Sequence, residues 1–259
     1  VNPRVGLGYR PFSSLLLRSS YATGFKAPVL DSMYAKGGGG FLSAKDESLC
    51  REKGGTFCSE PRSFFSENPG NPDLKEEEST SFTVGAVFEP TSWLNMSLDY
   101  YDIKVKNEVG TFDLDEVLKM EADGRSAELE SNGIIIERAI NEQGDLAVES
   151  IVNPWLNLGQ KRTRGLDLTV ETMNKFDNQF VGYSLSASKP LNFNEKLFQG
   201  SEDKDVLGEW SQGSGYHPVY RMNNSLTYGI SNNSLSLSAR TVGPHRKREN
   251  IGEIKSYSE

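Results

Sequence analysis

The chain has 259 residues, of which 36% are hydrophobic, with a mean hydropathy of −0.52 and a formal net charge of −8. No run approaches the roughly 18 consecutive apolar residues that a membrane-spanning helix needs, and the acidic balance argues against a nucleic-acid partner. A transmembrane β-barrel remains compatible with this composition, because each of its strands is apolar on one face only.

Apolar residues at every second position indicate β-strands along most of the chain. In chain order the alternation runs through residues 5–9, 15–25, 82–88, 94–100, 165–171, 180–188, 220–230 and 235–241. We therefore predict eight strands that form four up-and-down hairpins.

The connections between these strands alternate between short and long. Short turns rich in Pro, Ser, Asn, Asp and Thr fall at 11–14, 90–93, 174–179 and 231–234, and long connections fall at about 29–78, 110–158 and 194–216. This alternation is typical of bacterial outer-membrane barrels, in which periplasmic turns are short and extracellular loops are long.

The first two long connections carry most of the negative charge and some local patterns. Residues 29–79 hold ten acidic and six basic side chains, and residues 110–158 hold eleven acidic and three basic ones. Residues 114–130 have helical spacing, and residues 133–151 predict a small hairpin that turns at 142–145. The run of four glycines at 37–40 predicts a flexible stretch.

The meaning of the two faces depends on the fold. In a soluble sandwich the apolar face is the core, whereas in a transmembrane barrel it meets lipid and the polar face lines the lumen. Long strands, a polar face of small residues and tyrosines near the apolar face favour the barrel. In that case the following residues face the lumen, where they pair with each other or with a plug: Arg18, Asp167, Glu171 and Arg240.

The only two cysteines enclose a short polar stretch. Cys50 and Cys58 flank Gly54 and Gly55, which allow a tight turn. We favour a disulfide over two free thiols, and a disulfide implies an oxidising compartment such as a periplasm or a cell surface. A metal site is poorly supported, because two sulfurs are too few ligands and neither histidine is nearby in sequence.

Several stretches resemble the TonB-dependent outer-membrane receptors. LLLRSSYATGFKAPVLDSMY (15–34) resembles a barrel strand that ends in a Gly-Phe-Arg-Ala-Pro box, with Lys26 in place of Arg. NPDLKEEESTSFTVGAVFEP (71–90) resembles the next strand's Asn-Pro-Asn/Asp-Leu-Lys-Pro-Glu box, with Glu76 in place of Pro. LNMSLDYYDIKVKNEV (94–109) and NLGQKRTRGLDLTVE (157–171) resemble later strands, and all four stretches occur in the family's order.

The resemblance implies an all-β fold, an antiparallel up-and-down transmembrane β-barrel of about 22 strands with a plugged lumen. We expect residues 1–259 to be part of that barrel domain, about eight strands of a larger barrel with long extracellular loops. We expect the plug domain and the terminal strands to lie outside this chain.

The function implied by the resemblance is transport without bond chemistry. It is TonB-energised uptake of a scarce, bulky nutrient, above all a ferric siderophore, across the outer membrane of a Gram-negative bacterium. The implied partners are the TonB complex (through the missing N-terminal region), the extracellular nutrient and outer-membrane lipid. We expect no enzyme activity, catalytic residue or cofactor, because no nucleophile elbow, zinc-protease motif or phosphate-binding loop is present. A passive porin-like channel and a surface β-sheet binding protein remain alternatives.

Aromatic residues in the long connections are candidates for ligand contact. Each competes with the alternative that the ring packs inside its own loop. The candidates are Phe41, Phe64, Phe65, Trp155 and Trp210.

Overall fold

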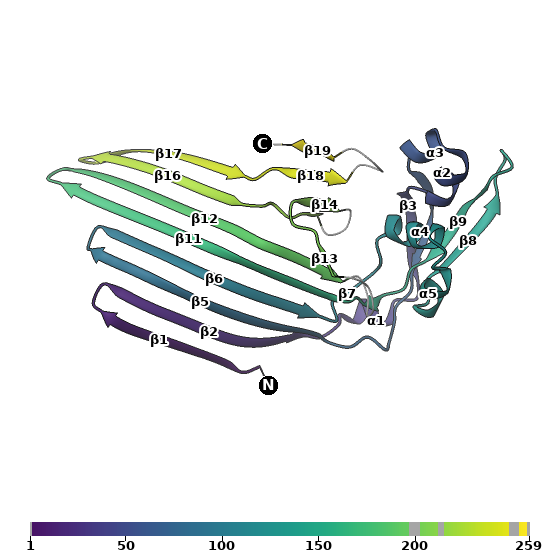
Figure 1. Ribbon diagram of the computed structural model, residues 1–259, viewed down its shortest axis with the longest axis horizontal. Coiled ribbons are helices and arrows are strands. Elements are labelled where there is room, and N and C mark those ends of the chain that lie inside the picture. The colour runs from purple at the N-terminus through teal and green to yellow at the C-terminus, as the bar shows by residue number, and fades with distance from the viewer. Residues whose placement is uncertain (1, 197–202, 212–214, 249–253, 258–259) are drawn as a thin grey trace.

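The computed structural model describes residues 2–196, 203–211, 215–248 and 254–257. Its main feature is one curved antiparallel sheet with the strand order β1-β2-β5-β6-β11-β12-β16-β17, in which each long strand pairs with its sequence neighbours (Figure 1). The sheet is not closed, and β1 and β17 are its two edges. The long strands are β1 (Arg4–Phe12), β2 (Leu15–Lys26), β5 (Glu77–Thr91), β6 (Leu94–Lys106), β11 (Gln160–Phe176), β12 (Gln179–Lys196), β16 (Arg221–Ile230) and β17 (Asn233–Val242).

The predicted eight strands and four hairpins are confirmed, and so are the short turns. All four turns lie at one end of the sheet, at the left of Figure 1. Asp177 and Ser231 adopt positive φ angles of 44° and 50° in two of these turns, the conformation that tight hairpin turns require. The Ser231 N–H donates to the Asn178 carbonyl at 2.7 Å, which joins neighbouring turns.

The register places apolar and polar residues on opposite faces. One row of paired residues contains Leu17, Ala86, Leu98 and Leu168 on one face. Because successive side chains of a strand point to opposite faces, the adjacent row, which contains Arg18, Gly85, Asp99 and Asp167, lies on the other. We call these the apolar face and the polar face.

The long connections gather at the opposite end and fold into elements of their own. The first contains α1 (Leu30–Tyr34), β3 (Gly38–Ala44), α2 (Glu47–Lys53), α3 (Thr56–Ser59) and β4 (Arg62–Asn68). The second contains β7 (Val109–Gly110), α4 (Leu114–Ala122), α5 (Ser126–Ser131), β8 (Ile135–Ile140), β9 (Leu146–Val152) and β10 (Leu156–Asn157). The helical spacing at 114–130 and the hairpin at 133–151 are thus confirmed.

The short strands beyond β12 complete the described elements. β13 (Lys204–Asp205) pairs with β12, while β14 (Glu209–Ser211), β15 (Gly215–Tyr216), β18 (His245–Arg248) and β19 (Ile254–Tyr257) form a small separate sheet. Among the described residues, no helix is long and apolar enough to cross a membrane.

The expectation that glycines 37–40 are flexible is wrong. Gly38, Gly39 and Gly40 lie in β3, which pairs with β4 in antiparallel register. A Cβ on Gly39 would lie 2.5 Å from Phe65 Cζ and 2.8 Å from the Ser66 carbonyl oxygen. Glycine is needed here because the Phe65 ring and the neighbouring strand come too close for any side chain.

The first two long connections form a single folded unit. β3, β4, β9 and β8 make one sheet, in which β4 runs parallel to β9 and Phe65 pairs with Ser150. We call residues 27–76 and 107–159 the headpiece. Both connections contribute to its hydrophobic core of buried side chains, which comprises Ala44, Phe64, Phe112, Val117, Leu118, Met120, Leu129, Ile134 and Ile151.

Candidate functional site

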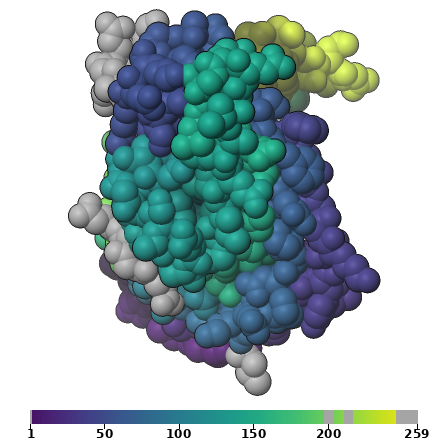
Figure 2. Space-filling view, turned by 90° about the vertical axis from the view of Figure 1, so that its right-hand side faces the viewer, coloured from purple at the N-terminus to yellow at the C-terminus, as the bar shows by residue number. Residues whose placement is uncertain are grey.

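The headpiece lies at the end of the sheet that is opposite the hairpin turns (Figure 1). Figure 2 looks onto it, and the blue surface of the first connection adjoins the teal surface of the second without a break. It is the largest folded structure outside the long strands, and it is the surface that a ligand arriving from this end would meet.

Asparagine side chains bond to backbone groups both within the second connection and between the two connections. Asn153 is 2% exposed, donates to the Phe112 carbonyl at 2.8 Å and accepts from the Phe112 N–H at 3.2 Å. Asn68 donates to the Asn153 carbonyl at 2.8 Å, and Asn71 donates to the Trp155 carbonyl at 2.9 Å. A primary amide both donates and accepts, so it satisfies backbone groups that would otherwise be buried without a partner.

Asn157 performs the same task where the headpiece meets the long strands. Its amide nitrogen donates to the Lys75 carbonyl at 2.8 Å and to the Asn107 carbonyl at 3.0 Å. Its amide oxygen accepts from the Lys75 N–H at 2.8 Å. The stems of both connections are therefore held together beside β5, β6 and β11. Asn68, Asn71 and Asn153 each precede a proline, whereas Asn157 lies between two leucines, so no shared sequence signal identifies this role.

The Cys50–Cys58 disulfide is present, with 4.6 Å between the two Cα atoms. It joins α2 to α3 across Gly54 and Gly55, whose φ angles are 67° and 61°. The α2 helix begins at Asp46, whose side chain accepts from the Leu49 N–H at 3.2 Å. This is an ordinary N-cap, and it fixes where the helix carrying Cys50 starts.

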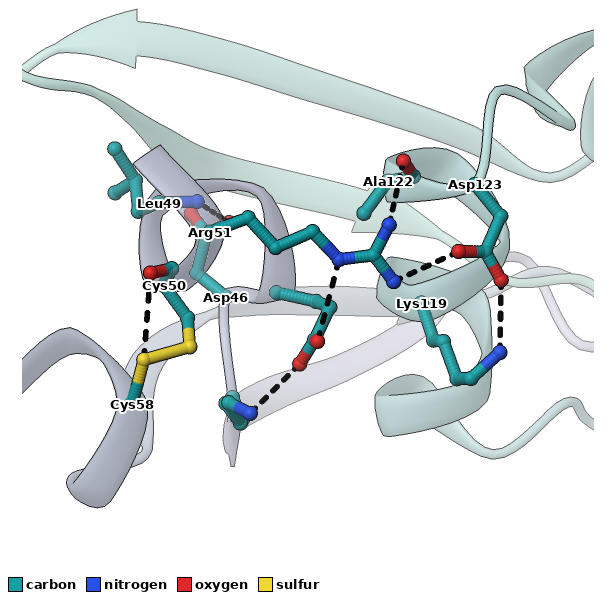
Figure 3. A network of polar contacts seen from close by, with 10 residues as sticks. Asp46, Leu49, Cys50, Arg51, Cys58, Lys119, Ala122 and Asp123 are labelled. Atoms are coloured by element: carbon teal, nitrogen blue, oxygen red, sulfur yellow. Dashed lines mark hydrogen bonds and ion pairs between the residues drawn. A yellow bond between two sulfur atoms is a disulfide. The ribbon is translucent and has the colours of Figure 1, made fainter. Parts of the chain in front are cut away.

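Ion pairs connect this disulfide-bonded corner to the second connection. Figure 3 shows Arg51, which donates to the Ala122 carbonyl at 3.0 Å and to Asp123 at 2.7 Å. Lys119 reaches the other Asp123 oxygen at 2.7 Å. These side chains are partly exposed, so each pair alone contributes little stability, although a network of several pairs contributes more.

A more buried ionic group lies between α2, α4 and β8. Arg138 is 14% exposed and binds Glu121 at 2.6 Å and Asp46 at 3.0 Å. These hydrogen bonds raise the pKa of Arg138 above its ordinary value in spite of burial. A partly buried guanidinium that bonds two carboxylates is stabilising only while both partners remain, so Arg138 ties the two connections into one arrangement.

Asp113 caps α4 and has a strongly shifted pKa. Its carboxylate accepts from the Asp115 N–H at 3.0 Å and from the Glu116 N–H at 3.2 Å. Burial is the largest effect and raises its pKa to about 6, with the neighbouring acids Asp115 and Glu116 adding to the rise. Above pH 6 the folded protein therefore holds Asp113 as a buried, ionised carboxylate, and this burial is energetically unfavourable.

The predicted ligand-contact aromatics fall into different environments. Phe41 is 78% exposed, Phe65 is 39% exposed, and their rings meet edge to face with centroids 5.7 Å apart. Phe64 is 3% exposed in the core, so we do not retain it as a ligand contact. Trp155 is half-buried beside the asparagine contacts. Trp210 lies in β14, and its side chain is outside the described part of the structure.

On the polar face, the predicted lumen-facing residues share one side of the sheet. Arg18 donates to both carboxylate oxygens of Asp99, at 2.9 and 2.5 Å, across the intervening strand β5. It passes over Gly85, where any Cβ would overlap the Asp99 carboxylate. The sequence pattern predicted that Arg18 lies on this face, but it did not identify Asp99 as its partner. Alternation along one strand does not show which side chains meet across two strands. The register places Asp167, Glu171 and Arg240 on the same face.

Solved structures of several receptors share this fold. The chain resembles the siderophore receptor PirA from Acinetobacter baumannii, with 14% identity, a TM-score of 0.56 and coverage of 100% of this chain and 30% of that one. It also resembles a variant of the ferric enterobactin receptor PfeA from Pseudomonas aeruginosa in complex with enterobactin, with 18% identity, a TM-score of 0.61 and coverage of 99% and 31%.

The RagAB peptide importer is a third similar structure, with 13% identity, a TM-score of 0.51 and coverage of 93% of this chain and 29% of that one. The chain thus spans about 30% of the length of the receptors to which it is similar. No curated protein sequence matches it. The model of the TonB-dependent receptor-like β-barrel family matches residues 1–250. This chain belongs to that family.

Proposed function

We propose that this chain is a barrel segment of an outer-membrane receptor that takes up a ferric siderophore with energy from the TonB complex. Residues 1–259 form one part of the barrel domain, and the plug and the TonB-contacting segment lie elsewhere in the full-length protein. Membership of the family, together with two neighbours that are named siderophore receptors, supports this proposal.

The observation that carries the proposal is the two-sided sheet with a folded headpiece at one end. Long strands with an apolar face and a polar face suit a wall between lipid and a filled lumen. The short turns then face the periplasm and the headpiece faces the outside. A disulfide in the headpiece suits that oxidising location.

The headpiece would take part in ligand capture, and no bond chemistry is required of it. Phe41 and Phe65 present an exposed aromatic pair on the side of the headpiece sheet that is opposite its core. An aromatic siderophore group such as a catechol stacks on such rings. Phe41→Ala is therefore expected to weaken ligand binding, whereas the matched change Ile140→Ala, at an equally exposed position of β8, is expected to leave it unchanged.

Uptake of radioactive iron by cells that express the full-length protein as their only siderophore receptor tests the proposal. We expect accumulation of iron supplied as a ferric catecholate, and its loss when the TonB complex is deleted. Uptake that persists without the TonB complex would favour a passive channel. Uptake of oligopeptides in place of iron would favour import of the kind named for RagAB. Protein that stays soluble without detergent would favour a surface binding protein.

A further inference from the structure

The apolar face does not remain apolar along the whole length of the strands. At the register level of Leu15 it carries Phe88, Met96 and Val170, but nearer the headpiece the same face becomes charged. Tyr21 and Phe82 mark the change. Five basic residues stand on this face around that level, and we call them the basic rim: Lys104, Lys106 and Arg162 lie beyond Phe82, Arg164 lies level with it, and Lys189 lies one residue pair nearer the hairpin turns.

The basic rim outnumbers the acids beside it. The register of β5 and β6 places the acidic residues Asp102 and Glu78 on the same face at this end, and β13 adds Asp205, which pairs with Asn194, the β12 partner of Arg162. Arg162 binds both oxygens of Asp102, at 2.9 and 2.5 Å, and this pair takes two of the five N–H donors of the guanidinium. Arg164 donates to the Asn192 amide oxygen at 3.2 Å, which directs it toward β12.

A hollow of about 210 Å³ opens within the basic rim. It is lined by Tyr21, Thr80, Phe82, Asp102, Lys104 and Arg162. One side of this hollow therefore offers cationic and hydroxyl donors, and the other offers two aromatic rings. A phosphate group suits the first side, because Arg and Lys bind phosphate with charge-assisted hydrogen bonds. Acyl chains suit the second.

Bases on a lipid-facing surface are costly unless their charged groups reach the membrane interface, where an anionic headgroup adds further attraction. This inference rests on the proposed function, since it needs the apolar face to meet the membrane. We propose that the basic rim and its hollow bind the phosphate of an anionic lipid headgroup in the leaflet next to the headpiece. The aromatic side of the hollow favours a lipid over free phosphate, because acyl chains pack against the rings of Tyr21 and Phe82, a contact that a free anion lacks.

The test is a lipid titration of the full-length protein in detergent, followed by native mass spectrometry. The probes are phosphatidic acid, zwitterionic phosphatidylcholine and inorganic phosphate. We expect phosphatidic acid to remain bound where phosphatidylcholine is lost, and inorganic phosphate not to compete at equal concentration. Equal retention of both lipids would overturn the proposal, and so would full competition by inorganic phosphate.

Three variants locate the site. The double change Lys104→Gln with Arg162→Gln should weaken phosphatidic acid binding by roughly fivefold for each base removed. Lys161→Gln is the matched control, since Lys161 adjoins Arg162 on β11 but lies on the polar face, and it should bind as wild type does. Asp102→Asn should bind more tightly, because it removes the acid inside the hollow.

These variants keep the outcome interpretable. If the double variant fails to fold, the Asp102→Asn and Lys161→Gln proteins still decide, because only a phosphate site predicts a gain for the first and no change for the second. The opposite order of affinities would overturn the proposal. A protein that inserts into membranes without lipid preference contradicts this inference alone, whereas a protein that does not insert contradicts the proposed function.

Discussion

Gly85 is needed because the Arg18–Asp99 ion pair crosses β5 directly above it. In Gly85→Ala the new methyl group overlaps the Asp99 carboxylate and lies 2.8 Å from the Leu98 carbonyl oxygen. The pair must open and the backbone must shift, so we expect a loss of about 1–3 kcal/mol. Thermal unfolding of the full-length protein in detergent measures this loss.

Gly8→Ala is the control for this change. Gly8 pairs with Arg18 in the same row, but its nearest heavy atom to an added Cβ is Leu16 Cδ1 at 3.7 Å, an ordinary contact. We expect a change within about 0.5 kcal/mol, as for unconstrained positions. If both alanine variants unfold at the same temperature, the close approach at Gly85 is unimportant.

Asp113 makes the stability of α4 depend on pH. Because the folded-state pKa of about 6 exceeds the ordinary aspartate pKa of 3.8, the folded state binds the proton more tightly than the unfolded state. Protonated Asp113 therefore contributes to the free energy of unfolding. This contribution is complete below pH 3.8 and is lost as the pH rises through 6. Asn caps a helix as well as Asp does, so Asp113→Asn should stabilise α4 above pH 7 by about 1–3 kcal/mol.

Hydrogen exchange of the α4 backbone amides, corrected for intrinsic rates, measures this dependence. Wild-type protection should decline between pH 4 and pH 7 relative to the variant, and the two should converge at the acidic end. A difference that grows toward acid would mean that ionised Asp113 stabilises the helix.

At the scale of the element, the two faces of β11 predict opposite tolerance for charge. Leu168 lies on the apolar face and Thr169 on the polar face. A basic residue facing lipid near the membrane midplane costs about 2–4 kcal/mol, while a lumen position tolerates it. Leu168→Arg should therefore reduce the amount of assembled barrel far more than Thr169→Arg does. Heat-modifiable migration on gels of cell envelopes compares the two, and equal assembly would argue against a lipid-facing apolar face.

The α2–α3 corner depends on its disulfide. The bridge closes a loop between residues that are eight apart in sequence, and its removal is expected to cost about 2–3 kcal/mol on loop-closure entropy. In Cys50→Ser with Cys58→Ser, protease cleavage within 46–60 should accelerate while the long strands stay protected. Thiol labelling of non-reduced wild-type protein should find no free cysteine, and labelling at both positions would refute the bridge.

At the scale of the molecule, local patterns predict the long strands well. Period-two alternation and short polar turns locate the four hairpins, because a hairpin pairs residues that are close in sequence. The headpiece sheet was not predictable in this way, since Phe65 and Ser150 come from different connections. The glycines of β3 show a similar limit, because their role depends on the position of Phe65.

The residues of the candidate site show the same distinction between features set by local sequence and features set by tertiary packing. The polar-face position of Asp167 follows from local sequence, whereas local sequence does not separate the exposed Phe41 from the buried Phe64. The burial of Phe64, the Arg18–Asp99 contact and the Asn153–Phe112 contacts depend on tertiary packing. Resemblance to a family supplied the order of the strands, and it carried no information about how the two connections pack together.

The shared construction of the headpiece constrains how this region can vary between related chains. Surface loops usually diversify one at a time, because each is anchored only at its own ends. Here β4 hydrogen-bonds to β9 and Arg138 binds Asp46, so each connection is completed by the other. Grafting one connection from a relative would leave half a sheet and would remove one of the two carboxylate partners of Arg138, or Arg138 itself. Variation in this region must therefore arise by exchange of both connections together, or by substitutions on the exposed side of the headpiece.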